Sequence, residues 1–208
     1  LLIGSASQAW SFQLRLAPAA DQTACGWSYG DCGDDEVFAR WYTFLVNYRV
    51  NNDAATDLDD PDLTQGDIVG AVDASFQSWE DVPSAILRFA NAGGTDNRIS
   101  GLDFVNTTLF YDAALDDDEC AGSLGEASGT FAMTISTIKT TGEIVDVDVV
   151  VDSADDWDWD DTDCVGFDLQ STLTHEYGHM VGFGHSDVCP GDGVDRPTMC
   201  QHGGTCDR

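Results

Sequence analysis

Basic side chains are almost absent from this chain. Lysine and arginine together number eight, with Lys139 the only lysine, whereas aspartate and glutamate number 38 and leave a formal charge of −30 at pH 7. Such a surface repels polyanions and anionic membranes, so neither nucleic acid nor a lipid surface is an expected partner. The charge fits either a solvated coat on a secreted protein or adaptation to high salt, where screening relieves the self-repulsion.

Long apolar runs are also lacking. No stretch approaches the roughly 18 apolar residues of a membrane span, so no span is expected. The length of 208 residues, with 42% hydrophobic side chains, suits one domain with a sizeable core. Residues 1–9 resemble the tail of a signal peptide, with the small residues Ser7 and Ala9 placed as at a cleavage site. We therefore expect an N-terminal extension over 1–40, holding this remnant and a short pro-segment, before a domain over 41–208.

Cysteine pairs of the C-x-x-C kind are missing, although seven cysteines are present. A second zinc site built from thiolates is therefore not expected. So many cysteines suit an oxidising compartment, and together with the signal-like start they predict a secreted, extracellular protein. The spacing allows the local pairings Cys120 with Cys164, and Cys189 with Cys200 or Cys206, and leaves one cysteine odd.

Histidine is scarce, yet three of the four histidines fall in the stretch 175–185, which reads H-E-x-x-H-x-x-G-x-x-H. His175 and His179 are four apart, so on a helix they project from one face and can share a metal ion. Gly182 can take a positive φ at the helix end, which lets the chain turn back. His185 then completes a three-histidine set with an open fourth position, as a catalytic zinc needs.

Glu176 stands beside the first histidine of this motif. A carboxylate placed there, near the water but outside the metal shell, can act as general base and then pass the proton to a leaving amine. The motif therefore predicts a peptide hydrolase with one catalytic zinc. Two alternatives stay open: histidines that bind no metal, and a site that binds zinc without turnover.

The pattern of strands and helices predicts an α+β domain. Thr64, with Asp67 three positions later, can cap a helix whose residues Ile68, Val72, Phe76 and Trp79 recur at helical spacing and are expected in the core. A loop is expected over 51–62 and an active-site helix over 167–181. Strands are expected at 43–50, 85–90, 103–111, 130–138 and 143–151.

The extended zinc motif, with Ser186 directly after the third histidine, resembles the matrixins. These are the matrix-metalloproteinase branch of the metzincins, here in the short form of bacterial secreted proteases. Residues 41–50 resemble the first matrixin strand, 72–89 the following helix and second strand, and 142–151 the strand before the active-site helix. The resemblance implies a twisted mixed sheet of about five strands with an antiparallel edge strand, an active-site helix and a Met-turn. It also implies a monomer that acts on peptide or protein substrates.

Met199, in the stretch 196–200, is the candidate for the Met-turn and is expected to form a hydrophobic floor under the metal without coordinating it. The interval from His185 to Met199 is longer than is usual in matrixins. Gln201 occupies the place where astacins carry a tyrosine ligand, which favours a simple three-histidine site. Few residues follow Met199, so we expect the C-terminal helix of metzincins to be missing. Truncation, or closure by disulfides instead, would explain its absence.

The resemblance suggests a further regulatory residue, Cys25. Matrixin zymogens carry a Cys-Gly pair whose thiolate fills the open zinc position, and Cys25 precedes a glycine at a similar distance from the domain. The other residues of that switch motif are absent here, which favours the alternative of a short disulfide between Cys25 and Cys32.

Residues 129–137 occupy the place of the matrixin edge strand, which pairs with an extended substrate through main-chain hydrogen bonds. Thr130, Phe131, Ala132 and Met133 are therefore candidate substrate-binding positions, although a plain sheet strand explains the run equally well. Aspartate clusters at 57–62, 116–118 and 152–163 could bind Ca²⁺, or could be solvated surface, since none has the EF-hand pattern. The rival to a secreted zinc endopeptidase is a non-catalytic extracellular binding module, either a pseudoprotease or an incomplete fragment.

Overall fold

The structure, a computed structural model, describes residues 12–14, 38–58, 63–111, 130–153, 157–158, 167–186, 189 and 197–200. Several expectations fall on other residues and lie outside this description: the Cys25 switch and its Cys32 alternative, the Cys120–Cys164 pair, the aspartates at 116–118, Gln201 and the end of the chain. None of the described helices is long and apolar enough to cross a bilayer.

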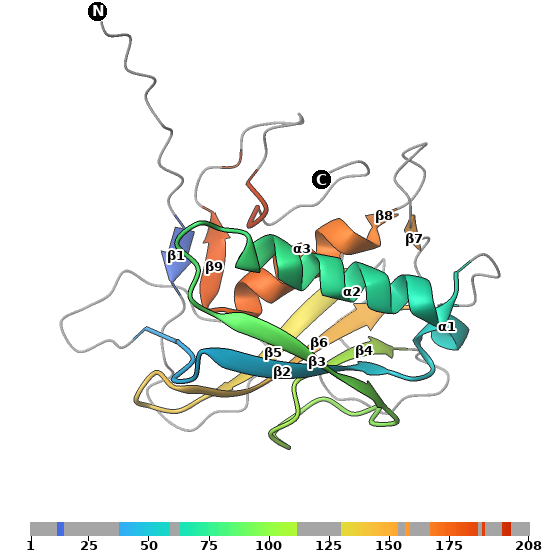
Figure 1. Cartoon of the computed structure of the whole chain (residues 1–208), viewed down its shortest axis with the longest axis horizontal. Coiled ribbons are helices and arrows are strands. Elements are labelled where there is room, and N and C mark those ends of the chain that lie inside the picture. The colour runs from blue at the N-terminus through green and yellow to red at the C-terminus, as the bar shows by residue number, and fades with distance from the viewer. Residues whose placement is uncertain are drawn as a thin grey trace, which may run out of the picture.

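A five-stranded mixed sheet forms the centre of the described fold, and two helices pack on one of its faces (Figure 1). The strand order is β3-β2-β4-β6-β5. The first four strands of that order run parallel, and β5 lies at the edge, antiparallel to β6. The predicted α+β fold with an antiparallel edge strand is therefore confirmed. The bounds are β2 Leu45–Asn51, β3 Arg88–Thr95, β4 Thr107–Tyr111, β5 Ala132–Ile138 and β6 Ile144–Asp152.

Shorter elements complete the described fold. Strand β1 (Phe12–Leu14) pairs antiparallel with β9 (Phe183–Ser186), and β7 (Trp157–Asp158) pairs in parallel with β8 (Phe167–Asp168). Helix α1 (Ala54–Asp57) is a single turn within the stretch expected to be a loop. The β1–β9 pair places residues from the N-terminal part beside the strand that carries His185.

Helix α2 (Gln65–Glu80) begins where its capping residues predict. The Thr64 hydroxyl accepts a hydrogen bond from the Asp67 amide at 3.2 Å, and the Asp67 carboxylate accepts one from the Thr64 amide at 2.9 Å. This reciprocal pair satisfies two donors that the first turn of a helix leaves open. Of the predicted core residues, Ile68, Val72 and Phe76 are buried, and Trp79 is partly buried and packs against the core.

Aromatic contacts join α2 to the second helix, α3 (Leu169–Met180), and to the sheet. The Phe76 ring stacks on Tyr177 of α3 with 3.8 Å between centroids, and on Tyr48 of β2 at 4.1 Å. The indole of Trp79 donates to the carbonyl of Thr174 at 2.8 Å. These contacts fix the position of α3 over the sheet.

Helix α3 begins two residues later than predicted, because Asp168 caps it by accepting a hydrogen bond from the Ser171 amide. At its other end, the Trp41 indole donates to the carbonyl of Met180 at 2.9 Å. On the helix itself, the side chains of Leu169 and Leu173 are fully buried. Both ends of α3 are thus tied to the fold, which fixes the positions of His175 and His179 on it.

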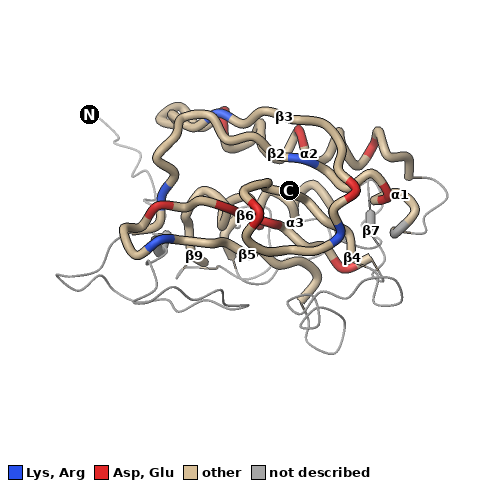
Figure 2. Tube along the Cα trace, turned by 90° about the horizontal axis from the view of Figure 1, so that it is seen from below, with Lys and Arg blue, Asp and Glu red and all other residues tan. Residues whose placement is uncertain are grey.

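Three of the predicted strands match the structure to within two residues at each end, and the other two differ by more. The strand expected at 103–111 starts only at Thr107, because the preceding loop turns around the buried carboxylates of Asp146 and Asp148 on β6. Acidic positions on β6 are visible from below in Figure 2. The strand expected at 85–90 is β3, which runs on to Thr95 through two glycines and lies at the other edge of the sheet.

Candidate metal centre

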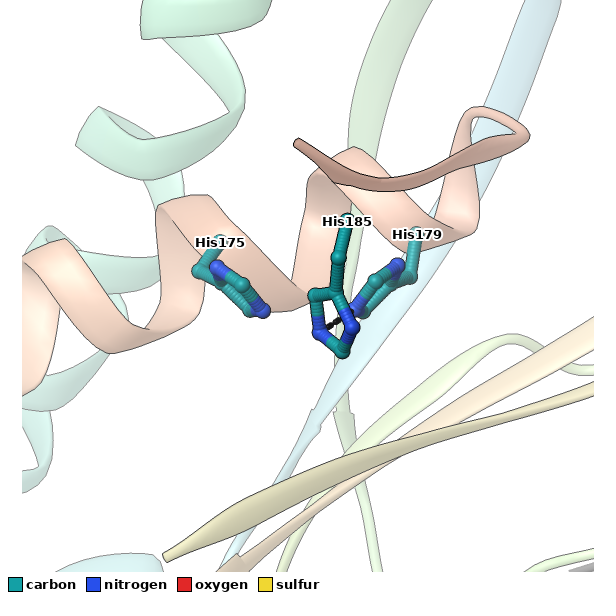
Figure 3. A group of neighbouring side chains, drawn as sticks. All are labelled: His175, His179 and His185. Atoms are coloured by element: carbon teal, nitrogen blue, oxygen red, sulfur yellow. Dashed lines mark hydrogen bonds between the residues drawn. The ribbon is translucent and has the colours of Figure 1, made fainter. Parts of the chain in front are cut away.

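Three histidine rings face one another where α3 and β9 meet (Figure 3). His175 and His179 come from α3 and His185 from β9. One ring nitrogen from each lies within 4.8 Å of the others, and the Nε2 atoms of His179 and His185 are 3.2 Å apart. Nitrogen ligands on a tetrahedral zinc are about 3.3 Å apart when each Zn–N bond is about 2.0–2.1 Å. The His179–His185 pair therefore has the spacing of two ligands on one zinc, and the third ring nitrogen lies close enough for the group to hold a metal ion.

The Nδ1 atoms of His175 and His179 each contact a main-chain carbonyl, and these contacts select the tautomer of the two rings. His175 Nδ1 lies 2.7 Å from the carbonyl oxygen of Thr198, and His179 Nδ1 lies 2.8 Å from that of Phe183. A carbonyl only accepts hydrogen bonds, so in both rings Nδ1 is the donor, and in the neutral form of the ring Nε2 keeps the lone pair. The facing Nε2 atoms of His179 and His185 need a proton or a cation between them, because two lone pairs would repel. A neutral imidazole with a free Nε2 is the form that ligates zinc.

Gly182 makes the turn that brings His185 back to the helix. It has a φ of +105°, the positive value that its place in the motif predicts, and its amide donates to the His179 carbonyl at 3.0 Å. A Cβ at this position would lie 2.6 Å from the main-chain oxygen of Ala39. A side chain here would therefore be strained both in its backbone and by this close approach.

Met199 is fully buried in a turn closed by a hydrogen bond from the Cys200 amide to the Pro197 carbonyl at 3.0 Å. Its own carbonyl accepts from Ser186 of β9 at 2.6 Å. A Cβ on Gly178 of α3 would lie 2.1 Å from the Met199 sulfur. The absence of a side chain at Gly178 thus lets the turn pack directly against the helix that carries the first two histidines.

A disulfide joins Cys200 of this turn to Cys189, with 5.6 Å between the Cα atoms. It is one of the two pairings of Cys189 that the spacing allows. The bond tethers the turn that supplies the Thr198 carbonyl to the segment after β9. The geometry of His175 therefore depends on residues well beyond the histidine motif.

Glu176 lies beside the histidines, not among them. Its side chain is buried, and the described group of three potential ligands does not include it. The Thr134 hydroxyl of β5 lies 2.5 Å from Glu176 Oε2 and 2.9 Å from its main-chain oxygen. The carboxylate is thus held between α3 and the edge strand of the sheet.

The predicted substrate positions Thr130, Phe131, Ala132 and Met133 lie at the start of the edge strand, which begins at Ala132. Side chains alternate along it. Ala132 packs into the main core, whereas Met133 packs against Ile135 and the residues around it on the other face of the sheet. Met133 therefore points away from the histidine side.

Sequence reasoning missed three contributors to the centre. Thr134 lies in the predicted edge strand, but that strand also holds Ser136 and Thr137, so one hydroxyl among three is a weak signal. Gly178 stands inside the histidine motif, where its glycine could have indicated a close approach. The Thr198 carbonyl acts through the backbone and leaves no trace in the side-chain pattern.

In the same region, burial raises the pKa of Tyr177, whose hydroxyl bonds that of Thr108 at 2.7 Å. That phenol therefore stays neutral.

Comparison with protein families gives one match, and a search of curated proteins finds no significant similarity. The matching family model is that of the matrixins, over residues 40–190, well over half of the chain. The match takes in all five strands of the central sheet, both long helices and the three histidines. On this evidence, and with the sheet order and histidine cluster described above, the chain belongs to the matrixin family of metzincins.

Proposed function

We propose that this protein is a secreted, zinc-dependent endopeptidase. The observation that carries the proposal is the convergence of His175, His179 and His185 beside a buried glutamate that is not itself a ligand. Three protein ligands leave a fourth tetrahedral position for water or substrate, which distinguishes catalytic from structural zinc sites. Membership of the matrixin family supports the same reaction class.

In the proposed mechanism, His175, His179 and His185 hold the zinc through Nε2. When bound, the zinc supplies a Lewis acid that lowers the pKa of water and polarises the scissile carbonyl. Glu176 accepts the proton of the attacking water at Oε1 and later delivers it to the nitrogen of the leaving amine. Met199 packs against α3 and, with the Thr198 carbonyl, keeps the first histidine in its ligating orientation.

The proposed substrate is an extended peptide that adds to the outer edge of β5. An edge strand offers main-chain groups to such a peptide, and this edge lies next to Glu176 through Thr134. Thr130, Phe131, Ala132 and Met133 are the positions proposed to flank it. A monomer with its catalytic domain over 41–208 is part of the proposal. For Cys25 we propose a disulfide to Cys32, with the switch residue as the alternative, and Ca²⁺ binding is a separate proposal for the aspartate clusters.

The proposal of secretion rests on the cysteine content, the signal-like residues 1–9 and the Cys189–Cys200 disulfide. Mapping the disulfides in protein isolated from its native source tests both the oxidising compartment and the switch. A Cys25 bridged to Cys32 rules the switch out.

The Glu176→Gln variant tests the function. It should retain zinc, since Glu176 is not a proposed ligand, and should lose roughly 100- to 10,000-fold in kcat on a fluorogenic peptide, because the general base is gone. Glu143→Gln is the matched control: Glu143 pairs with Lys139 in an exposed ion pair at 2.7 Å. It should retain full activity. Near-normal hydrolysis by Glu176→Gln refutes the role, and a wild-type protein that binds zinc without hydrolysis favours the binding-module alternative.

A further inference from the structure

One side chain outside the histidine motif contacts the proposed general base. Thr134 is buried on β5 and its hydroxyl oxygen lies 2.5 Å from Glu176 Oε2. A carboxylate has no proton to give, so the threonine donates. The distance falls in the range of charge-assisted O–H···O⁻ hydrogen bonds, about 2.5–2.7 Å, which are stronger than neutral ones.

We propose that Thr134 is a positioning residue that holds the Glu176 carboxylate for proton transfer. This inference rests on the proposed peptidase function. By binding Oε2, the hydroxyl fixes the plane of the carboxylate and leaves Oε1 as the oxygen that accepts the water proton. Catalysis is sensitive to such placement, because a displacement of about 1 Å in a reacting group can cost about 100-fold in rate.

The strand holds the hydroxyl rigidly enough for this role. Thr134 pairs with Val149 of β6, so the backbone on that side is fixed by the sheet. Its β-branched side chain has few rotamers, and its single proton faces two acceptors on Glu176, of which Oε2 at 2.5 Å is closer than the main-chain oxygen at 2.9 Å. The edge strand proposed to bind substrate would thus also orient the base, which couples the two parts of the site.

A structural role is the competing explanation, since any buried hydroxyl needs a partner. The chain offers a matched control in Thr108 of β4. Thr108 is equally buried, and its hydroxyl bonds the Tyr177 hydroxyl of α3 at 2.7 Å, one residue after Glu176. Thr108→Val removes a buried strand-to-helix hydrogen bond without touching the carboxylate. Thr134→Val removes the bond to the base with little change in shape, and Thr134→Ser restores the hydroxyl.

Steady-state kinetics on a fluorogenic peptide, with zinc content and melting temperature measured on the same samples, test the inference. Thr134→Val should lower kcat roughly 10- to 100-fold at an unchanged KM, because the substrate contacts remain. Thr134→Ser should return kcat to near the wild-type value. Thr108→Val should keep both kcat and KM near the wild-type values. All variants should hold the zinc content of the wild type. If Thr134→Val does not fold, Thr134→Ala takes its place.

A second readout does not depend on activity. In the metal-free protein, denaturant unfolding of Thr134→Val, Glu176→Ala and the double variant should show non-additive losses, because both single changes break the same hydrogen bond. Additive losses overturn the inference, as does an unchanged kcat in Thr134→Val, a loss confined to KM, or a failure of serine to restore the rate. A wild-type protein without zinc-dependent hydrolysis refutes the proposed function instead.

Discussion

Adding one methyl group to α3, at Gly178, should disturb the candidate metal centre through its contact with Met199. In Gly178→Ala the new Cβ would lie 2.1 Å from the Met199 sulfur and 2.7 Å from Cζ2 of Trp79. Non-bonded atoms do not approach so closely, so Met199, Trp79 or the helix must move. The tip of a methionine is flexible, but this one is fully buried, and the Trp79 indole is held by its hydrogen bond to Thr174.

The change in the free energy of unfolding of Gly178→Ala follows from two opposing effects. Alanine is favoured over glycine in a helix by about 1 kcal/mol. Overpacking a well-filled core costs about 1–3 kcal/mol. With two neighbours in conflict, we expect the cost to exceed the gain and the free energy of unfolding to fall by about 1–2 kcal/mol. For a chain of this size that corresponds to a fall of roughly 2–8 °C in melting temperature.

The zinc affinity should fall as well. The turn that Met199 occupies also supplies the Thr198 carbonyl to His175 Nδ1. Loss of such a partner weakens metal affinity about 10- to 100-fold. Denaturant unfolding of the metal-free protein and competition with a chromophoric chelator measure the two effects separately.

Gly66→Ala on α2 is the matched control. Its Cβ would meet nothing closer than the Thr64 hydroxyl oxygen at 3.6 Å, so it should preserve or raise stability, by up to about 1 kcal/mol, with no change in zinc affinity. A Gly178→Ala protein with wild-type stability and wild-type zinc affinity would refute the packing argument.

Three further predictions concern pH, the disulfide and the metal. Burial raises the pKa of Asp146 to about 6 and that of Asp148 to about 8, well above the value of about 3.9 in an unfolded chain. The folded state therefore holds extra protons, and these groups make the free energy of unfolding decrease as pH rises from about 4 to 8. Asp146→Asn, whose amide can replace the unpartnered Oδ1, should remove the share of the decrease that Asp146 contributes between about pH 4 and 6, and leave the share of Asp148. Identical pH profiles of stability for the variant and the wild type would contradict this. Replacing Cys189 and Cys200 by alanine should lower the free energy of unfolding by roughly 2–3 kcal/mol and weaken zinc binding, since the turn loses its tether. A double variant equal to the wild type in denaturant unfolding and zinc competition would show that the tether is dispensable. Free zinc at 100 times its Kd should stabilise the chelator-treated protein by about 2.7 kcal/mol, and a melting temperature indifferent to zinc would exclude a folded-state site.

The sequence was most informative where structure is local. The four-residue spacing of His175 and His179 and the pair Thr64 and Asp67 depend only on helix geometry, so their placement could be predicted without the fold. The positive φ at Gly182 follows from the same local reasoning.

Contacts between distant parts of the chain could not be predicted in the same way. Thr134 meets Glu176 across 42 positions, and Thr198 meets His175 across 23. Neither contact has a periodic signal, because each depends on how the sheet, the helix and the Met199 turn pack. The late start of β4 has a similar origin, since its preceding residues donate amides to carboxylates on β6, far away in the sequence.

A zinc titration of peptide hydrolysis tests the central claim most directly. Chelator-treated protein would be assayed on a quenched fluorescent peptide library while zinc is added and bound zinc is quantified. The proposed mechanism predicts no cleavage without metal, and cleavage that rises in proportion to bound zinc and saturates at one zinc per chain. Cleavage that persists in the metal-free protein, or a fully zinc-loaded protein that cleaves no peptide, would contradict it.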